Sequence, residues 1–502
     1  MGTEIKKKEQ TMMCAEELKL NNVRNKKLNS KETRKTSGIT LIALVVTIVV
    51  LLILAGITIS LVFSENGIIA KAKEAAEKTN QAAINEQEQM NEVAGYLDNM
   101  LNEIGGSGEE PTPPKPTLPS DGSYSEEKGV NTPNLGEGMT AIKWDKTKND
   151  WVETDGSDQE WYDYTAKKWA NAKTSDGSMW VWIPRYAYSI TSGYHSSNAG
   201  TIEVEFMKGL TNETSTGRKS FDNVSGQGKW NIHPAFTYGS TVSGLWVAKF
   251  EASSKEGNSN SDSGDNVTTK TLQVKPGVAS WRYINIGNMY TVCKEYNSTL
   301  NSHMMKNDEW GAAAYLSKSK YGKENEEVWI NNNSSYITGS AGNSATADTD
   351  VGTTTEYTST QGVRASTTGT VHGIYDMNGG AWEYVAGYLD NGNISLMQQG
   401  ASLVNGDAKM KNVYIRGSQD TQLDNYNANS SKYGDAMYET SSGYEIKNES
   451  WYNDFSDFPY EDGPFLKRGG GYSDCLFAGI FYFYFNVDNY SNDSFRPVLV
   501  AL

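Results

Sequence analysis

The sequence is poor in the residues from which small proteins build disulfide and metal frameworks. It has only three cysteines in 502 residues, Cys14, Cys293 and Cys475, and no pair of them has CxxC spacing. They therefore support neither a disulfide scaffold nor a thiolate zinc site, although a single bridge between Cys293 and Cys475 stays open. The histidines lack ligand spacing, so we expect structural roles for them. They are His195, His233, His303 and His372.

Basic residues are fewer than acidic ones, and the N-terminal part of the chain has no tryptophan. The chain has 45 Lys and Arg against 61 Asp and Glu, a net charge of -16. Phosphate contacts need clustered basic residues, so this composition argues against nucleic acid as the partner of the whole protein. Every tryptophan lies between Trp144 and Trp451. A large aromatic core can therefore be built only from the C-terminal part of the chain.

The one basic cluster lies in residues 1–37 and precedes an uncharged apolar run at 39–63. As a helix this run would be roughly 37 Å long, enough to cross a hydrocarbon core of ~30 Å. The positive-inside rule keeps the basic leader in the cytoplasm and places the rest outside. A cleaved secretory signal is the alternative, but the run is too long for one. We expect a membrane-anchored protein whose C-terminal part is displayed at the cell surface.

The junction between leader and apolar run reads KTSGITLIAL at 35–44. It resembles the class III signal of type IV pilins and pseudopilins, which a prepilin peptidase cuts after the glycine. The resemblance implies a cut between Gly38 and Ile39 and N-methylation of Ile39. Pilins carry a glutamate where this chain has Ala43, and that glutamate helps to align subunits. Assembly with other pilin-like subunits therefore does not follow, and a plain single-pass anchor is the alternative.

A stalk and a spacer follow the apolar run. Apolar residues recur at three-to-four spacing from Met90 to Ile104, which predicts an amphipathic helix that continues outward from the membrane. Glycines at 105–108 end it, and the prolines at 111–119 predict a stiff spacer of ~3.1 Å per residue. We expect a leader at 1–38, a pilin-like transmembrane and stalk helix at 39–104, a Pro/Gly-rich linker at 105–135 and a ligand-binding domain at 136–502.

From about residue 136 short apolar or aromatic runs alternate with clusters of Gly, Asn, Ser and Thr. This pattern predicts a loop-rich α+β domain. Two polar inserts, at 253–269 and 331–370, are expected to be surface loops.

A series of motifs gives this domain a family resemblance. They are MWVWIP at 179–184, LWVAKFE at 245–251, KNDEW at 306–310, GIYDMNGGAWEY at 373–384, RGGGY at 468–472 and SFRP at 494–497. Their order is similar to that of the formylglycine-generating-enzyme/sulfatase-modifying-factor family. The resemblance implies a version of the C-type lectin fold.

The resemblance does not transfer the family's activity. Its oxidases hold copper with two closely spaced cysteines after the Arg-Gly-Gly segment, since thiolates suit Cu(I). Here only Cys475 lies near that place, and the position five residues on is Ile480. We therefore expect no copper and no enzymatic activity.

The family's calcium site does have a counterpart. The resemblance implies side-chain oxygens from Asp376 and Glu383 and carbonyl oxygens from Gly379 and Ala381, an all-oxygen set suited to a structural Ca²⁺ ion. The alternative is that this segment, with Trp382, belongs to the core and that Glu383 pairs with a buried donor.

Residues 472–494 read YSDCLFAGIFYFYFNVDNYSNDS and contain no Lys, Glu, Gln, Met or Trp. Every residue type present can be reached from an AAC or AAT codon by changes at its adenines. The stretch resembles the variable region of target proteins of diversity-generating retroelements, whose reverse transcriptase randomises adenines. Such targets carry the C-type lectin fold with a C-terminal variable region.

The composition of this stretch suits a binding surface, because Tyr, Asn and Ser also dominate antibody loops. The alternation at 480–485 predicts that one parity points inward and that the tyrosines point outward. The candidate ligand-binding residues are Tyr472, Asp474, Tyr482, Tyr484, Asn486, Asp488, Asn489, Tyr490, Asn492 and Asp493.

The sequence thus predicts an adhesin-like protein on a bacterial surface, with a diversified C-terminal surface that binds a protein or glycan on another cell or phage. A sulfatase-modifying-factor-like oxidoreductase and a minor pilin subunit are the alternatives.

We predict that the mature protein begins at Ile39, because Gly38 ends the pilin-like signal. Mass spectrometry of the N-terminal peptide from isolated membranes checks this, and a Gly38→Leu variant should keep its leader. An intact leader in the unaltered protein would leave only a plain anchor.

Overall fold

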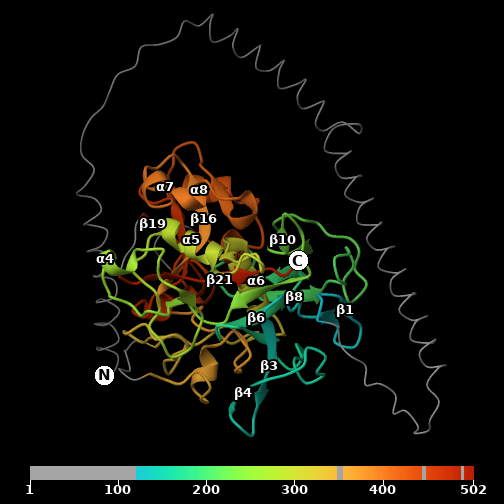
Figure 1. The fold of residues 1–502 in the computed structure, drawn as a ribbon. Coiled ribbons are helices and arrows are strands. Elements are labelled where there is room, and N and C mark those ends of the chain that lie inside the picture. The colour runs from blue at the N-terminus through green and yellow to red at the C-terminus, as the bar shows by residue number, and fades with distance from the viewer. Residues whose placement is uncertain (1–119, 348–353, 444–447, 488–490) are drawn as a thin grey trace, which may run out of the picture. The chain divides into compact units, whose positions relative to one another are not determined.

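Two sheets organise the part of the chain that the structure, a computed structural model, describes. That part comprises residues 120–347, 354–443, 448–487 and 491–502 (Figure 1). The predicted leader with Gly38 and Ile39, the apolar run and the stalk helix lie outside these residues. Within them, no helix is both long enough and apolar enough to cross a membrane.

The larger sheet has seven strands in the order β15-β21-β12-β6-β5-β3-β4, and every neighbouring pair is antiparallel. β21, the last of these strands in the sequence, lies inside the sheet between β15 and β12. The strands are β3 (Met139–Asp145), β4 (Asp150–Glu153), β5 (Asn171–Thr174), β6 (Met179–Pro184), β12 (Gly244–Ala248), β15 (His303–Met304) and β21 (Pro497–Leu499).

The second sheet is mixed. β16 pairs in parallel with β17 and β20 and antiparallel with β18, which in turn pairs with β19. Its strands are β16 (Trp382–Asp390), β17 (Asn412–Ile415), β18 (Phe465–Gly469), β19 (Gly479–Asn486) and β20 (Asp493–Phe495). A third sheet has the order β8-β7-β9, with β7 (Tyr186–Ser192), β8 (Thr201–Phe206) and β9 (Asn231–Ile232).

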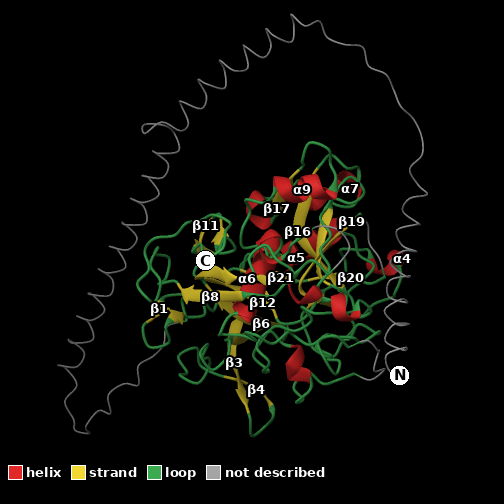
Figure 2. Cartoon of the chain, turned by 180° about the vertical axis from the view of Figure 1, so that it is seen from behind, coloured by secondary structure: helices red, strands yellow, loops and turns green. Residues whose placement is uncertain are grey.

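Helices are few, and loops take much of the described chain (Figure 2). The two longest helices are α5 (Ile286–Tyr296) and α6 (Asn307–Lys318), and the shorter ones are α4 (Asp262–Asp265), α7 (Ser395–Gln398), α8 (Ala401–Val404) and α9 (Gln422–Ala428). Turns of 3-10 helix are Gly362–Ala365, Ala408–Met410, Tyr438–Thr440, Trp451–Asn453 and Cys475–Phe477. The two-residue strands are β1 (Tyr124–Ser125), β2 (Val130–Asn131), β10 (Thr237–Tyr238), β11 (Ser240–Thr241), β13 (Ser253–Ser254) and β14 (Leu272–Gln273). The expected mixed α+β class is confirmed.

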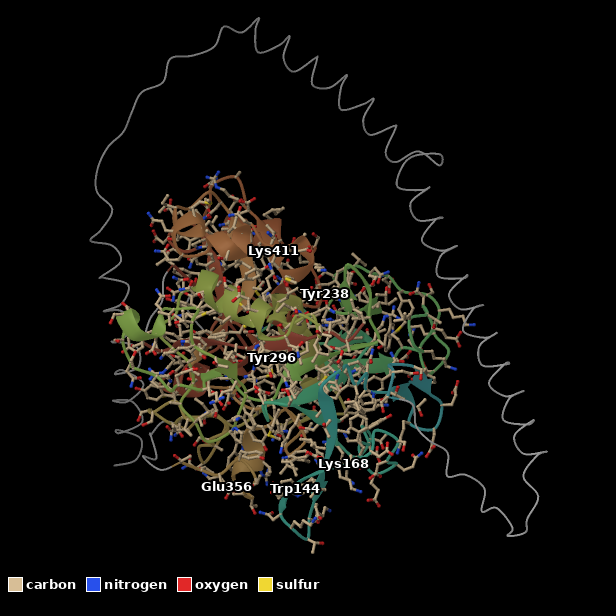
Figure 3. The ribbon with its side chains drawn as sticks, viewed as in Figure 1. Trp144, Lys168, Tyr238, Tyr296, Glu356 and Lys411 are labelled. Carbon is tan, nitrogen blue, oxygen red and sulfur yellow. The ribbon has the colours of Figure 1, made fainter. Side chains whose placement is uncertain are left out.

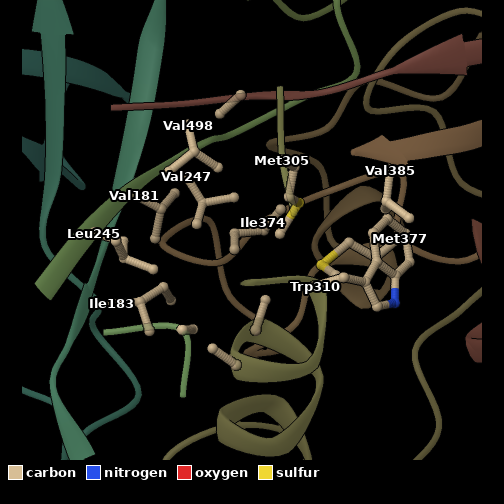
Figure 4. Packing of buried hydrophobic residues seen from close by; sticks show 14 of the residues in the cluster. Val181, Ile183, Leu245, Val247, Met305, Trp310, Ile374, Met377, Val385 and Val498 are labelled. Carbon is tan, nitrogen blue, oxygen red and sulfur yellow. The ribbon is translucent and has the colours of Figure 1, made fainter. Parts of the chain in front are cut away.

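The core lies between the large sheet and α6. Every residue of β6 and β12 is buried, as expected for central strands that are covered on both faces. Figure 4 shows Val181 and Val247, a cross-strand pair, on the side of the sheet that faces Ile374 and Met305. The apolar motifs at 179–184 and 245–251 are therefore the centre of the fold.

Helix α6 joins this core to the second sheet. The Glu309 carboxylate accepts the Lys306 backbone N–H at 2.8 Å and closes the first turn. All residues of the helix are buried. The Trp310 indole N–H donates to the Ile480 carbonyl of β19 at 2.8 Å. One side chain thus connects the helix to the stretch predicted to vary.

The folded part begins earlier than the sequence suggested. The Trp182 and Trp246 indoles donate to the carbonyls of Asn131 and Asn134, at 3.3 and 2.6 Å. Strands β1 and β2 also precede residue 136. The expected boundary at 136 is therefore too late, because residues 120–135 belong to the described fold and indoles distant in sequence bind their backbone groups.

The polar inserts are surface loops only in part, since most of 255–264 is exposed or partly exposed but the start of each insert is buried. Ser253, at the start of one, is fully buried, and so is Asn331, at the start of the other. The Asn331 side-chain amide donates to Asp376 at 2.9 Å. Polar residues occur in these inserts because they bind buried polar groups.

We predict that Trp310→Ala lowers the free energy of unfolding by ~3–5 kcal/mol, because it removes a fully buried indole and its hydrogen bond. Urea unfolding followed by circular dichroism measures this. Trp144→Ala is the control, since Trp144 is only partly buried on β3 near the periphery (Figure 3) and should cost much less. Equal losses in the two variants would contradict the placement of Trp310 at the core.

Candidate binding surface

The stretch 472–494 lies along the second sheet. Among the described strands β19 pairs only with β18, and β20 pairs with β16. Residues 488–490 lie outside the described residues, so Asp488, Asn489 and Tyr490 of the predicted set are not placed. The other predicted residues can be located.

The expectation that the tyrosines of β19 point outward is corrected at Tyr482, which is fully buried. Its ring centroid lies 6.0 Å from that of Phe455, and Phe481 packs against Trp451 at 5.1 Å. The strand is thus covered on both faces by the preceding segment, so both parities are buried. Burial also raises the pKa of the Tyr482 hydroxyl. Only Tyr484 is partly exposed.

Tyr484 belongs to a cluster around Lys467 of β18. Its ring stacks on that of Trp382, with centroids 6.4 Å apart and an interplanar angle of 13°. The Lys467 ammonium lies 3.6 Å from the Trp382 centroid and 5.3 Å from the Tyr484 centroid. It also pairs with Asp493 at 3.2 Å, whose other oxygen accepts the Asn486 amide at 2.8 Å. Three residues of the predicted set therefore surround a lysine that lies outside it.

A second group adjoins this cluster. The Asp474 carboxylate accepts the Trp382 indole N–H at 2.5 Å and the Gly471 N–H at 2.9 Å. The neighbouring ring of Tyr472 meets Tyr336 edge to face at 5.1 Å. Asp474 is buried and orients the indole, whereas Tyr472 and Tyr336 are partly exposed.

Arg282 completes the group from a distant part of the sequence. Its guanidinium lies 3.9 Å from the centroid of the Tyr336 ring. It donates to the Ser491 carbonyl, next to Asn492, and to the Asn260 side chain. A cation stacked on a tyrosine thus anchors the segment before β20.

We call the partly exposed members of this group the tyrosine face. They are Tyr336, Trp382, Tyr472, Tyr484 and Asn492. The predicted residues Asp474, Asn486 and Asp493 lie beneath it and are buried, with 5%, 7% and 0% exposure. Of the ten predicted residues, the structure therefore brings six together, and it divides them into three partly exposed ones and three buried ones beneath them.

The sequence missed Tyr336, Arg282 and Lys467, and it placed Trp382 in the core. No local signal marks the first two, which lie far from the stretch in sequence. Lys467 could have been noticed, because a lysine in a strand next to the Arg-Gly-Gly motif needs a partner. The core interpretation of Trp382 is corrected, since the residue is only partly buried and its ring contacts Lys467 and Tyr484.

The predicted calcium residues are already bound to protein groups. Asp376 accepts the Gly339 N–H at 2.8 Å as well as the Asn331 amide. The Ala381 N–H donates to Glu251 at 2.9 Å. The Gly379 N–H donates to the Gly469 carbonyl.

Glu383 is engaged by a cation. Its carboxylate forms a two-point pair with Arg496, with one N–O distance of 3.0 Å. The described residues contain no group of three or more His, Cys, Asp or Glu arranged to hold a metal. The Glu383 carboxylate as arranged does not fit a directly coordinated Ca²⁺ ion, because Arg496 occupies it. The alternative in which Glu383 pairs with a buried donor is what the structure has.

Burial shifts the titration of this cluster. Desolvation raises the pKa of Glu383 to about 7, against the opposing effect of Arg496. Desolvation and the charges of Asp376 and Glu383 raise the pKa of Glu251 well above its ordinary value. Three buried carboxyl groups thus share one guanidinium.

The thiols do not offer the family's copper site. No disulfide joins Cys293 to Cys475, and Cys293 is buried on α5. Ile480 is a buried apolar residue of β19. A two-thiolate Cu(I) site cannot be built here.

The histidines take structural places. His303 bonds Glu309 at 2.9 Å at the start of α6. His233 packs against the rings of Tyr186 and Tyr188, and burial lowers its pKa to about 3.

Neither the protein-family models nor the curated proteins contain a match to this chain. The candidate surface therefore rests on its own geometry.

We predict that stability falls as the pH rises from about 4.5 toward and through 7. The carboxyls have raised pKa values in the folded state, so the stability they contribute is complete below the unfolded pKa of about 4.3 and is lost as the pH passes the folded values. Glu251→Gln removes one of the like charges and should reduce this loss by roughly 1–3 kcal/mol.

Melting temperatures between pH 5 and 8.5 test this. Glu160→Gln, at an exposed site, is the control and should follow the unaltered protein. If Glu251→Gln shows the full loss, the carboxyl cluster is not its origin.

Proposed function

We propose that this chain is a surface-displayed ligand-binding protein whose diversified C-terminal stretch binds its ligand through the tyrosine face. The observation that carries the proposal is the arrangement around Trp382 and Lys467. Tyr472, Tyr484 and Asn492, which belong to the stretch 472–494, are partly exposed around Trp382 and Lys467, while Asp474 and Asp493 hold those two side chains in place.

The chemistry of the face fits binding. Tyrosine and tryptophan rings provide large contact areas with few rotatable bonds, and neighbouring Asn and Ser adapt their hydrogen bonds to different ligands. The rings of Trp382 and Tyr484 are already aligned before any ligand arrives. Less entropy is then lost on binding.

The proposed fold is a C-type lectin fold of the formylglycine-generating-enzyme type. The motifs that carry the resemblance occupy the two large sheets and the helix between their sequences. MWVWIP forms β6, LWVAKFE begins in β12, KNDEW opens α6, GGAWEY leads into β16, RGGGY begins in the last two residues of β18, and SFRP joins β20 to β21. The place of these motifs at the centre of the domain supports a C-type lectin fold, which is more specific than the mixed α+β class.

In this proposal the N-terminal part of the chain displays the domain at the cell surface. An apolar run at 39–63 anchors the chain, with or without pilin-like cleavage at Gly38, and the linker holds the domain away from the membrane. The ligand is then a protein or glycan on another cell or on a phage.

The enzyme alternative is less well supported, because the residue set around Cys475 lacks a second thiol and Ile480 is apolar. The minor-pilin alternative would use the same anchor without a diversified surface. The neighbouring DNA separates these alternatives. A reverse-transcriptase gene beside a near-copy of the last coding bases, with mismatches at adenines, supports diversification, and its absence removes the support for it.

We predict that Tyr472→Ser combined with Tyr484→Ser weakens binding at least about tenfold, because each truncated interface tyrosine costs ~1–2 kcal/mol. Flow cytometry of the labelled protein on a panel of bacterial cells measures the binding. The melting temperature should change little, because both rings are partly exposed.

Tyr433→Ser, at another partly exposed tyrosine, is the matched control and should bind normally. A double variant that binds as well as this control would exclude the tyrosine face as the binding surface.

A further inference from the structure

A cleft of about 500 Å³ lies along strand β8, and none of its lining residues belongs to the stretch 472–494. Consecutive residues of β8, 201–205, form one wall. Residues after α6, among them Lys320 and Tyr321, form the other wall, and Trp230 lies at one end. Its volume is in the range of ordinary ligand sites.

Strand β8 presents a backbone edge to this cleft. It pairs with β7 on one side, and no described strand pairs with it on the other. At the end of the strand, the Phe206 carbonyl accepts the Ser215 N–H at 2.7 Å. That carbonyl therefore points away from β7, toward the free edge.

The direction of the remaining groups follows from the antiparallel pattern. Backbone groups of alternate residues point to the same side of a strand, so those of Val204 and Ile202 share the outward direction of Phe206. The partner strand agrees, because Tyr186, opposite Phe206, turns its carbonyl to the far side of β7, where it accepts the His233 N–H. The N–H and C=O groups of Ile202 and Val204 thus face the cleft that both residues line. The two residues are only 3% and 5% exposed, so a strand must enter the cleft to pair with them.

The walls supply positions for side chains of such a strand. The Trp230 ring is fixed by the Arg218 guanidinium, 3.8 Å from its centroid, and Arg218 is held by Glu205 at 2.9 Å. Glu203 on β8 and Lys320 on the opposite wall are exposed, and neither has an ion-pair partner within the described ranges. The cleft therefore offers an acidic side chain on β8, and it offers both Lys320 and Glu324 on the opposite wall.

We propose that this cleft binds an extended peptide, which adds to β8 as a further strand. Its backbone pairs with Ile202 and Val204, a cationic side chain faces Glu203, and an anionic side chain faces Lys320. Addition of a strand to an exposed sheet edge is an established mode of peptide recognition, in which main-chain hydrogen bonds give affinity and side-chain positions give specificity. A peptide fits better than a compact ligand, because consecutive residues of one strand line the cleft.

The test uses the full-length protein in detergent. A random peptide library displayed on phage is selected on the unaltered protein and depleted on Val204→Pro. Proline removes the outward N–H, and edge strands tolerate it where that N–H faces outward. Val204→Ala is the matched control, because it shortens the same side chain and keeps the N–H.

The expected result is a family of peptides that bind the unaltered protein and Val204→Ala alike and bind Val204→Pro at least about tenfold more weakly. Tyr472→Ser combined with Tyr484→Ser should leave this binding unchanged, so the outcome is independent of the proposed function. If no peptide survives depletion, the proposal is overturned.

A second measurement does not depend on the folding of the proline variant. Synthetic peptides of the selected sequence are N-methylated at odd or at even positions. Pairing with one strand edge predicts that only one of the two sets loses binding, and equal binding by both sets overturns the proposal. A dimer of the unaltered protein that Val204→Pro abolishes would also overturn it, since the edge would then serve a second copy of this chain.

Discussion

The guanidinium of Arg496 joins the two large sheets, and most of the described fold depends on it. It donates to the Ala248 carbonyl at the end of β12 and to the Tyr375 carbonyl, and it pairs with Glu383 of β16. Both side chains of the pair are almost completely buried. A buried pair contributes little compared with an apolar replacement, but loss of one partner leaves an unpaired charge and costs about 3–5 kcal/mol. The pair therefore fixes how the sheets meet.

A buried ion pair also supports the candidate surface. Lys467 and Asp493 form a second buried pair, with 2% and 0% exposure, directly beneath Trp382 and Tyr484. The rings above can change their ligand contacts, whereas the charges below fix their positions. Asp493, although it belongs to the adenine-accessible stretch, is for this reason a supporting residue. The partly exposed residues that could contact a ligand are therefore fewer than the residues of the stretch 472–494.

The sequence predicted the parts of the fold that depend on local pattern. The runs at 179–184 and 245–251 are apolar at nearly every position, and they are the fully buried strands β6 and β12. The position of the C-terminal stretch on a sheet, near the residues of the Arg-Gly-Gly motif, was also predictable. These features follow from hydrophobicity and from the order of the motifs.

What the sequence could not predict depends on contacts between distant segments. Alternation in β19 indicated an outward Tyr482, but the segment at 450–457 covers that face, and no periodicity records a covering loop. The start of the domain was placed too late because Trp182 and Trp246 use carbonyls in a segment that resembles a linker. The carboxylates assigned to calcium looked available only because Arg496, more than a hundred residues away, could not be paired with Glu383 from sequence.

The place of β21 inside the seven-stranded sheet restricts the kinds of mutation that the gene can accept. The stretch 472–494 is translated before β21, the strand between β15 and β12, exists. A frameshift or a stop codon in that stretch therefore removes the centre of a sheet, and an insertion of one residue displaces the alternation that β20 and β21 need. Changes at the adenines of AAC or AAT codons cause neither defect, since the third base remains a pyrimidine and no stop codon can arise. The chain order of the strands therefore lets the stretch 472–494 tolerate exchanges of residues better than changes in its length.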